Sequence, residues 1–124
     1  MYTLDTNAII YYLDQDPAVV PLLDRLFENV DTTFYVSTVT ELELYSYPDL
    51  SEEEEAGIKR LLTDMFVVPL DSRMARYAGY LRRLHRLKTP DSAIATTAIL
   101  TKTTLLTRNV KDFRQIENLK LQEI

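Results

Sequence analysis

The sequence predicts an α/β fold in which helices cover a mostly parallel sheet. Five short apolar or β-branched runs have the length and composition of strands, and the longer segments between them carry apolar residues at helical spacing. Strands that are continuously apolar and alternate with helices are typical of a parallel sheet buried on both faces. Of the 124 residues 46% are hydrophobic, so we expect a single domain over residues 1–124.

The first half of the chain alternates strand and helix. Residues 2–5 form a short apolar run that ends at Asp5, and "TNAIIYYL" then has the spacing of a helix. A second helix is expected in "DPAVVPLLDRLFENV", followed by a β-branched and aromatic strand at 33–37. "TVTELELYSY" predicts a helix that ends before Pro48, because the residue preceding a proline is disfavoured in a helix.

The middle of the chain predicts two further helices around a strand. "SEEEEAGIKRLLTDM" begins with Ser51 and Glu54 at the spacing of a capping box. Its four glutamates are therefore explained as helix-start residues rather than as a metal site. A strand follows at 66–70, and Asp71 is expected to cap the basic helix "SRMARYAGYLRRLHRLK".

The remaining elements complete the alternation. Thr89 is expected to cap the alanine-rich helix "DSAIATTAIL", with Pro90 in its first turn. Residues 103–107 are predicted as a strand, "NVKDFRQI" as a short helical turn and "LKLQEI" as a last edge strand. Ligands of such open sheets collect outside the carboxyl ends of the strands, so the polar residues at those ends are the candidates for a site.

The composition excludes several classes of chemistry. The absence of cysteine fits a reducing compartment and removes disulfides, thiolate metal sites and cysteine nucleophiles. His85 is the single histidine, so a histidine-rich zinc site is impossible, and the two glycines do not form a Gly-rich phosphate loop. No apolar run approaches the roughly 20 residues of a membrane span and nothing resembles a secretory signal, so we expect a cytoplasmic protein.

Charge is unevenly distributed along the chain. Residues 1–72 hold 15 acidic and 3 basic residues, net −12, whereas residues 73–124 hold 4 acidic and 11 basic residues, net +7. Six of the bases lie in one short stretch: Arg73, Arg76, Arg82, Arg83, Arg86 and Lys88. This stretch is either a solvated helix face or a surface that contacts phosphates.

Four acidic residues lie where one site could gather them: Asp5, Glu41, Asp91 and Asp112. Taken singly, each is explained as a helix cap, a favourable charge in a first helical turn or a surface residue. Taken together, carboxylates at one end of a sheet repel each other unless a cation or a proton neutralises them. An all-oxygen site of this kind suits Mg²⁺ or Mn²⁺, which activate water and polarise phosphate groups.

Only one glutamate of "TELEL" can face such a site, because residues two apart point to nearly opposite sides of a helix. We choose Glu41, which stands closer to the strand end and shares a face with Thr38 and Tyr45. Glu43 is the alternative.

Four motifs resemble the PIN domain family, specifically its VapC-type toxin ribonucleases of type II toxin–antitoxin pairs. The motifs are "LDTNAII", "STVTELEL", "TPDSAIATTA" and "LLTRNVKDF", and they follow the family's order from one end of the chain to the other. The resemblance implies a three-layer α/β/α fold with a five-stranded sheet of order 3-2-1-4-5. It also implies a metal-binding and catalytic cluster that consists of the acids Asp5, Glu41, Asp91 and Asp112.

The resemblance also implies partners and supporting residues. Polar positions that support the acids in the family match Asn7, Thr107 and Asn109. A homodimer is implied, as is a small cognate antitoxin whose tail enters the site and inhibits it.

The function that follows is a Mg²⁺- or Mn²⁺-dependent endoribonuclease that hydrolyses RNA phosphodiester bonds. Arg83, Arg86 and Arg108 are its candidates for phosphate contacts. The alternative is a catalytically silent PIN-fold module that acts through complex formation with an antitoxin-like partner. A third class, the metal phosphatases with an aspartate nucleophile, expects a second aspartate two residues after Asp5, where this chain has Asn7.

Overall fold

The computed structural model describes residues 1–124 and contains one five-stranded sheet whose strands are all parallel. The strands are β1 (Tyr2–Leu4), β2 (Phe34–Ser37), β3 (Phe66–Val68), β4 (Thr104–Thr107) and β5 (Lys120–Glu123). Their order is β3-β2-β1-β4-β5, so the order implied by the resemblance is confirmed. The order of connection reverses between β1 and β4, and ligand sites of open α/β sheets lie at the carboxyl ends of strands at such a point.

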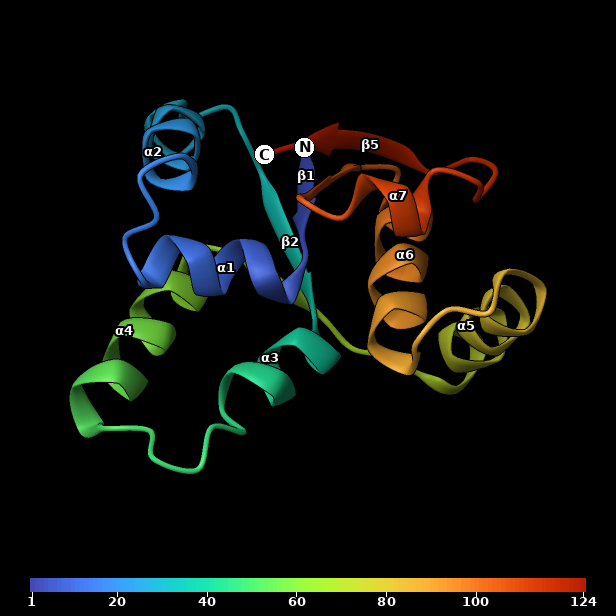
Figure 1. Cartoon of the computed structure of the whole chain (residues 1–124), viewed down its shortest axis with the longest axis horizontal. Coiled ribbons are helices and arrows are strands. Elements are labelled where there is room, and N and C mark those ends of the chain that lie inside the picture. Colours follow the sequence, from blue (N-terminus) through green and yellow to red (C-terminus); the bar gives the residue numbers. More distant parts are fainter.

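Seven helices accompany the strands. They are α1 (Thr6–Leu13), α2 (Val19–Glu28), α3 (Thr38–Leu44), α4 (Glu52–Thr63), α5 (Ser72–His85), α6 (Thr89–Thr101) and α7 (Val110–Phe113). Figure 1 shows α1, α2 and α4 on one side of the sheet and α5, α6 and α7 on the other. The expected three-layer α/β/α arrangement is therefore confirmed.

Two hydrophobic clusters cover the two faces of the sheet, as β4 illustrates. Leu105 and Leu106 are adjacent in this strand, so their side chains point to opposite faces. Leu106 packs in a cluster with residues of α1, α2 and α4, whereas Leu105 packs in a cluster with residues of α5, α6 and α7. Both leucines are fully buried, which explains why this strand is apolar at consecutive positions.

Most of the predicted helix starts are present. Ser51 and Glu54 form the expected capping box of α4, and Asp71 caps α5 through its side chain. The prediction that Thr89 caps α6 was wrong. The chain becomes helical at Thr89 itself, because the extended Lys88 occupies the cap position and leaves Thr89 inside the first turn.

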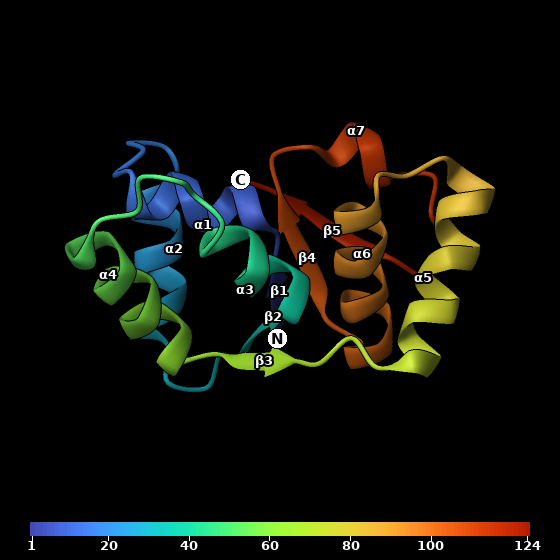
Figure 2. The same ribbon diagram turned by 90° about the horizontal axis from the view of Figure 1, so that it is seen from below.

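The ends of three helices meet near the carboxyl ends of the central strands. In Figure 2, α3 lies between α1 and α6, and it packs against both of them. This arrangement brings together the residues that follow β1 and β2 and those that begin α6. None of the helices combines the length with the apolar character that a bilayer crossing requires.

Candidate functional site

A pocket of about 190 Å³ lies at this end of the sheet and is lined almost entirely by polar residues. Its charged and polar lining consists of Asp5, Thr6, Asn7, Glu43, Lys88, Asp91, Asn109 and Asp112. Three of the four predicted acids, Asp5, Asp91 and Asp112, are therefore brought together from segments far apart in the sequence. Two larger pockets, which border α1 and α4, contain none of the predicted acids.

Asp5 forms the floor of the pocket and is only 5% exposed. Its Oδ1 accepts a hydrogen bond of 2.7 Å from the backbone N–H of Ala8, so Asp5 does cap α1. Its Oδ2 accepts a hydrogen bond of 2.6 Å from the hydroxyl of Thr107 at the end of β4. Burial raises the pKa of the Asp5 carboxyl, the two hydrogen bonds oppose that shift, and the charge of Glu43 adds to it.

Thr107 connects this floor to the loop that follows β4. Its hydroxyl oxygen accepts a hydrogen bond of 3.0 Å from the backbone N–H of Asn109 while its proton is donated to Asp5. Asn109 and Asn7 are exposed and line the pocket. Of the three predicted supporting residues, Asn7 and Asn109 line the pocket, and the buried Thr107 contacts the carboxylate of Asp5 from behind it.

Asp91 and Asp112 face the same pocket from α6 and α7. Partial burial raises the pKa of Asp91, the negative charges of Asp112 and Asp5 raise it further, and Lys88 opposes the shift. The carboxylates are thus close enough to repel each other. This repulsion is the electrostatic signature expected of a site that a cation would neutralise.

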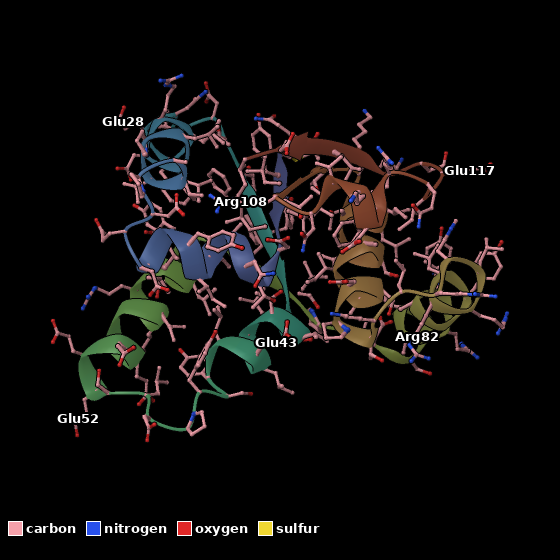
Figure 3. All side chains as sticks on the ribbon, in the orientation of Figure 1. Glu28, Glu43, Glu52, Arg82, Arg108 and Glu117 are labelled. Carbon is pink, nitrogen blue, oxygen red and sulfur yellow. The ribbon has the colours of Figure 1, made fainter.

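The structure corrects the choice between the two glutamates of α3. Glu43 lines the pocket, where its Oε1 accepts a hydrogen bond of 2.6 Å from the hydroxyl of Thr6, whereas Glu41 does not line it. Figure 3 shows Glu43 on α3 near the start of α1. The charge of Glu41 instead acts on Tyr45, whose pKa is raised first by burial and then by Glu41.

The packing of α3 explains why Glu43 rather than Glu41 lines the pocket. The buried residues Thr40 and Leu44 define the side of α3 that packs inward, and Thr40 also contacts the hydroxyl of Thr6 at 3.1 Å. Glu43 flanks this inward side on the edge that meets Thr6 of α1, whereas Glu41, three residues before Leu44, flanks it on the opposite edge. Nearness to the strand end did not decide which glutamate faces the pocket.

The predicted phosphate contact Arg108 is engaged elsewhere. Its guanidinium lies 3.3 Å and 3.4 Å from the two carboxylate oxygens of Asp16, and 4.1 Å from the centre of the Tyr11 ring. In Figure 3 it lies above α1, and it does not line the pocket. Arg83 and Arg86 are exposed at the end of α5 and do not line the pocket either.

Two pocket residues were missed by the sequence reasoning. Lys88 is the only basic residue that lines the pocket, and in the sequence it could not be told apart from its five basic neighbours. Thr6 donates to Glu43, a contact between helices 37 residues apart in the chain that no local pattern indicates.

The donor set fits a hard divalent cation. All the acidic donors are carboxylate oxygens, which suit Mg²⁺ or Mn²⁺, and their mutual repulsion would be relieved by positive charge. No three of them converge closely enough to hold an ion by themselves. Mg²⁺ usually keeps several waters and takes only one or two carboxylates directly, so the pocket fits an ion held partly through water.

Comparisons with known proteins agree with this fold. The PIN domain family matches residues 2–119 of the chain. The chain is 27% identical to "Ribonuclease VapC2" of Rickettsia felis, with 98% of this chain and 96% of the relative covered. It is 28% identical to "Ribonuclease VapC1" of Haemophilus influenzae, with 99% of this chain and 97% of the relative covered.

Solved structures give the same picture. The chain is similar to a chain in the crystal structure of VapBC2 from Rickettsia felis bound to a DNA fragment from their promoter, with a TM-score of 0.81 and 26% identity over 99% of this chain and 98% of that one. It is also similar to a chain of a toxin–antitoxin complex from Klebsiella pneumoniae, with a TM-score of 0.80 and 25% identity over the whole of both chains.

Proposed function

The chain belongs to the PIN domain family, and on that premise we propose that it is a metal-dependent endoribonuclease that acts as the toxin of a toxin–antitoxin pair. One observation carries the proposal. Asp5, Asp91, Asp112 and Glu43 line a single small pocket at the carboxyl ends of the central strands. Relatives that cover nearly the whole chain are named ribonucleases, which favours RNA as the substrate.

A divalent cation would be held by Asp5 and Asp91, with Glu43 and Asp112 completing its shell directly or through water. When bound, Mg²⁺ or Mn²⁺ supplies Lewis acidity, which ionises water near neutral pH and stabilises negative charge on a phosphate. The four carboxylates also exclude anions from the pocket until they are neutralised, so a phosphate can enter only with a cation.

The chain's own residues fix the orientation of the floor. Thr107 and the backbone N–H of Ala8 each hold one oxygen of Asp5, so this carboxylate cannot rotate without losing a hydrogen bond. Both bonds also favour the ionised form of Asp5 against the effect of burial. Asp91 also has a raised pKa, because burial and the neighbouring carboxylates disfavour its ionised form.

A small antitoxin and a second copy of the chain are the proposed partners. The similar structures are titled as VapBC and toxin–antitoxin complexes, which supports an antitoxin that binds this chain. We expect the tail of that antitoxin to enter the pocket and inhibit it. We expect the chain to form a homodimer in the complex.

The decisive experiment is RNA cleavage by the purified chain. The chain is incubated with a mixture of transfer, ribosomal and messenger RNA. We expect RNA cleavage in the presence of Mg²⁺ or Mn²⁺, and we expect the cleavage to stop when EDTA is added. Sequencing the 5′ ends of RNAs cut in cells, against the Asp5→Asn variant, would then identify the substrate. Cleavage that survives both EDTA and Asp5→Asn would overturn the mechanism.

The same experiment separates the silent-module alternative. If the chain binds an antitoxin but neither cuts RNA nor arrests bacterial growth, it acts through complex formation alone. Growth arrest that is relieved by Asp91→Asn would instead support the ribonuclease.

A further inference from the structure

We propose that the C-terminal end of α5 and its connection to α6 form a surface that binds the backbone of single-stranded RNA and leads it to the acidic pocket. We call this surface the basic track, and it consists of Tyr80, Arg83, Arg86 and Lys88, with Tyr80 and Arg83 three residues apart on the same side of α5. The inference rests on the proposed function, because it concerns the substrate of the same pocket.

None of the charges of the basic track forms an ion pair within the chain. Residues 72–90 contain six basic residues and no acidic residue. The chain has one ion pair, between Arg108 and Asp16, so no arginine of α5 is paired with a carboxylate. Six like charges on so short a segment repel one another, and a bound polyanion would relieve that repulsion.

The packing of α5 leaves these charges accessible. The helix uses Met74, Ala78 and Leu81 as its buried face, and it packs against α6. Arg82, Arg83 and the other α5 arginines are exposed. Their side chains are therefore free to contact phosphates without any rearrangement of the core.

Lys88 joins the basic track to the pocket. The helix α5 ends at His85, and the next residue, Arg86, adopts a left-handed conformation that turns the chain toward α6. Two residues later Lys88 lines the pocket beside Asp91, yet it makes no ion pair with any of the carboxylates there. Its ammonium group is therefore available to the phosphate of a strand that enters the pocket.

An aromatic side chain lies within the basic track. Tyr80 is 47% exposed, with the guanidinium of Arg83 5.9 Å from its ring centre and the ring of Tyr77 at 6.1 Å. An exposed ring among arginines can stack an unpaired base while the arginines hold the phosphates on either side. Bases within a duplex are not available for such stacking, so the arrangement favours single-stranded RNA.

The opposite end of the molecule, around the start of α4, repels the same ligand. Figure 3 shows Arg82 on α5 at one end of the long axis and Glu52 on α4 at the other. The first turn of α4 carries four glutamates. An RNA strand is therefore driven away from the α4 end and toward the basic track before it reaches the pocket.

The test measures RNA binding in the Asp5→Asn background, so that cleavage does not interfere. The probe is a fluorescein-labelled oligouridine of about 20 nucleotides, titrated by anisotropy at several salt concentrations. The test variant combines Arg83→Gln, Arg86→Gln and Lys88→Gln. The matched control combines Arg25→Gln, Lys59→Gln and Arg60→Gln, which removes the same number of charges from exposed residues on α2 and α4.

We expect the slope of log affinity against log salt to fall by about 2 in the test variant, since each phosphate contact on a single strand contributes about 0.7. Affinity near 0.1 M salt should fall at least about tenfold, and the control should keep the parental slope. Equal slopes and affinities in the two triple variants would overturn the basic track.

The aromatic part has its own test. Tyr80→Ala should weaken oligouridine binding roughly tenfold, whereas Tyr80→Phe should retain it because the ring is kept. A duplex RNA of the same length should bind the parent less tightly and should not respond to Tyr80→Ala. If the duplex binds as tightly as the single strand, the preference for unpaired RNA is wrong.

These outcomes are distinguishable from a failure of the proposed function. If the parental chain cuts RNA and the test variant cuts it with unchanged KM, the ribonuclease function is supported and the basic track is refuted. If the parental chain neither binds nor cuts RNA, both fall. Loss of self-association at low salt in the test variant, with RNA binding intact, would show that α5 meets the acidic α4 of a second copy instead.

Discussion

The floor and the rim of the pocket carry the same chemical group but hold it in different ways. On the floor, both oxygens of Asp5 are hydrogen-bonded and the side chain is nearly inaccessible. On the rim, Glu43 is half-buried with a single donor, Thr6, and Asp112 is exposed. The floor is fixed by the sheet and by a helix start, whereas the rim stands on helix surfaces and can adjust to a ligand.

The largest effect should come from removing the charge on the floor. Asp5→Asn keeps an oxygen for the N–H of Ala8, so α1 stays capped, but it removes the central carboxylate. We expect RNA cleavage to fall by about 10³-fold or more, equivalent to about 4 kcal/mol of transition-state stabilisation. The temperature of thermal unfolding should be at least as high as in the parent, because the variant replaces a buried carboxyl with a raised pKa by a neutral amide. Activity above about one tenth of the parent would contradict the role of the floor.

On the rim, the comparison becomes a choice between two glutamates of the same helix. Glu43→Gln should lower activity by about 10- to 100-fold, the usual effect of losing a partner in the outer shell of a metal. Glu41→Gln is the matched control and should cleave as the parent does, because Glu41 does not line the pocket. Cleavage assays over a range of Mn²⁺ concentrations would measure both, and equal losses would refute the assignment of Glu43.

Thr107→Val tests how firmly the floor is held, because it removes a hydrogen bond to Asp5 and leaves the carboxylate of Asp5 in place. The variant has nearly the same shape but loses the donor to Asp5 and the acceptor for the N–H of Asn109. We expect the free energy of unfolding at pH 7 to fall by about 1–3 kcal/mol. Thr97→Val, at a buried threonine that donates only to the carbonyl of Ala93 within its own helix, is the control and should lose less. Denaturant unfolding measures both.

The smallest effect concerns pH and added metal. In the fold, the pKa values of Asp5 and Asp91 are raised above their ordinary 3.8, so the folded chain binds more protons than the unfolded chain just above that pH. The free energy of unfolding should therefore fall as pH rises from 3.8 through the raised values. In Asp91→Asn the free energy of unfolding should fall less steeply with pH over this range, as denaturant unfolding at a series of pH values would measure.

Binding of Mn²⁺ should raise the free energy of unfolding at neutral pH, by about 1.4 kcal/mol at a Mn²⁺ concentration ten times its Kd. Thermal melts with and without Mn²⁺ would measure the shift in the parent. In Asp5→Asn the shift should shrink or vanish, and an undiminished shift in that variant would place the ion elsewhere.

Much of the fold could be predicted from local patterns, because the interactions that start each element are local. The capping box at Ser51 and Glu54 and the cap at Asp71 depend on residues three apart, and both were predicted correctly. The cap of α6 was misplaced by one residue, at Thr89 instead of Lys88, because a proline in the first turn is compatible with either start. The strand order came from family resemblance and not from any local pattern.

The site was predictable to the extent that it follows from strand ends. Asp5 and Thr107 end neighbouring parallel strands, so any sheet that pairs these strands brings the two side chains together. Asp91 and Asp112 were identified by motifs, and the structure brings them to the pocket that Asp5 lines. The metal they are proposed to hold stays a prediction.

The sequence by itself determined which elements form and which polar residues end them, since both depend on neighbours along the chain. Only the tertiary structure decided that Glu43 and not Glu41 faces the pocket, because the phase of α3 is set by its packing against α1 and α6. It likewise decided that Arg108 pairs with Asp16, 92 residues away, while Lys88 remains free at the pocket. Such choices depend on which surfaces meet across the fold, and spacing within one segment carries no information about them.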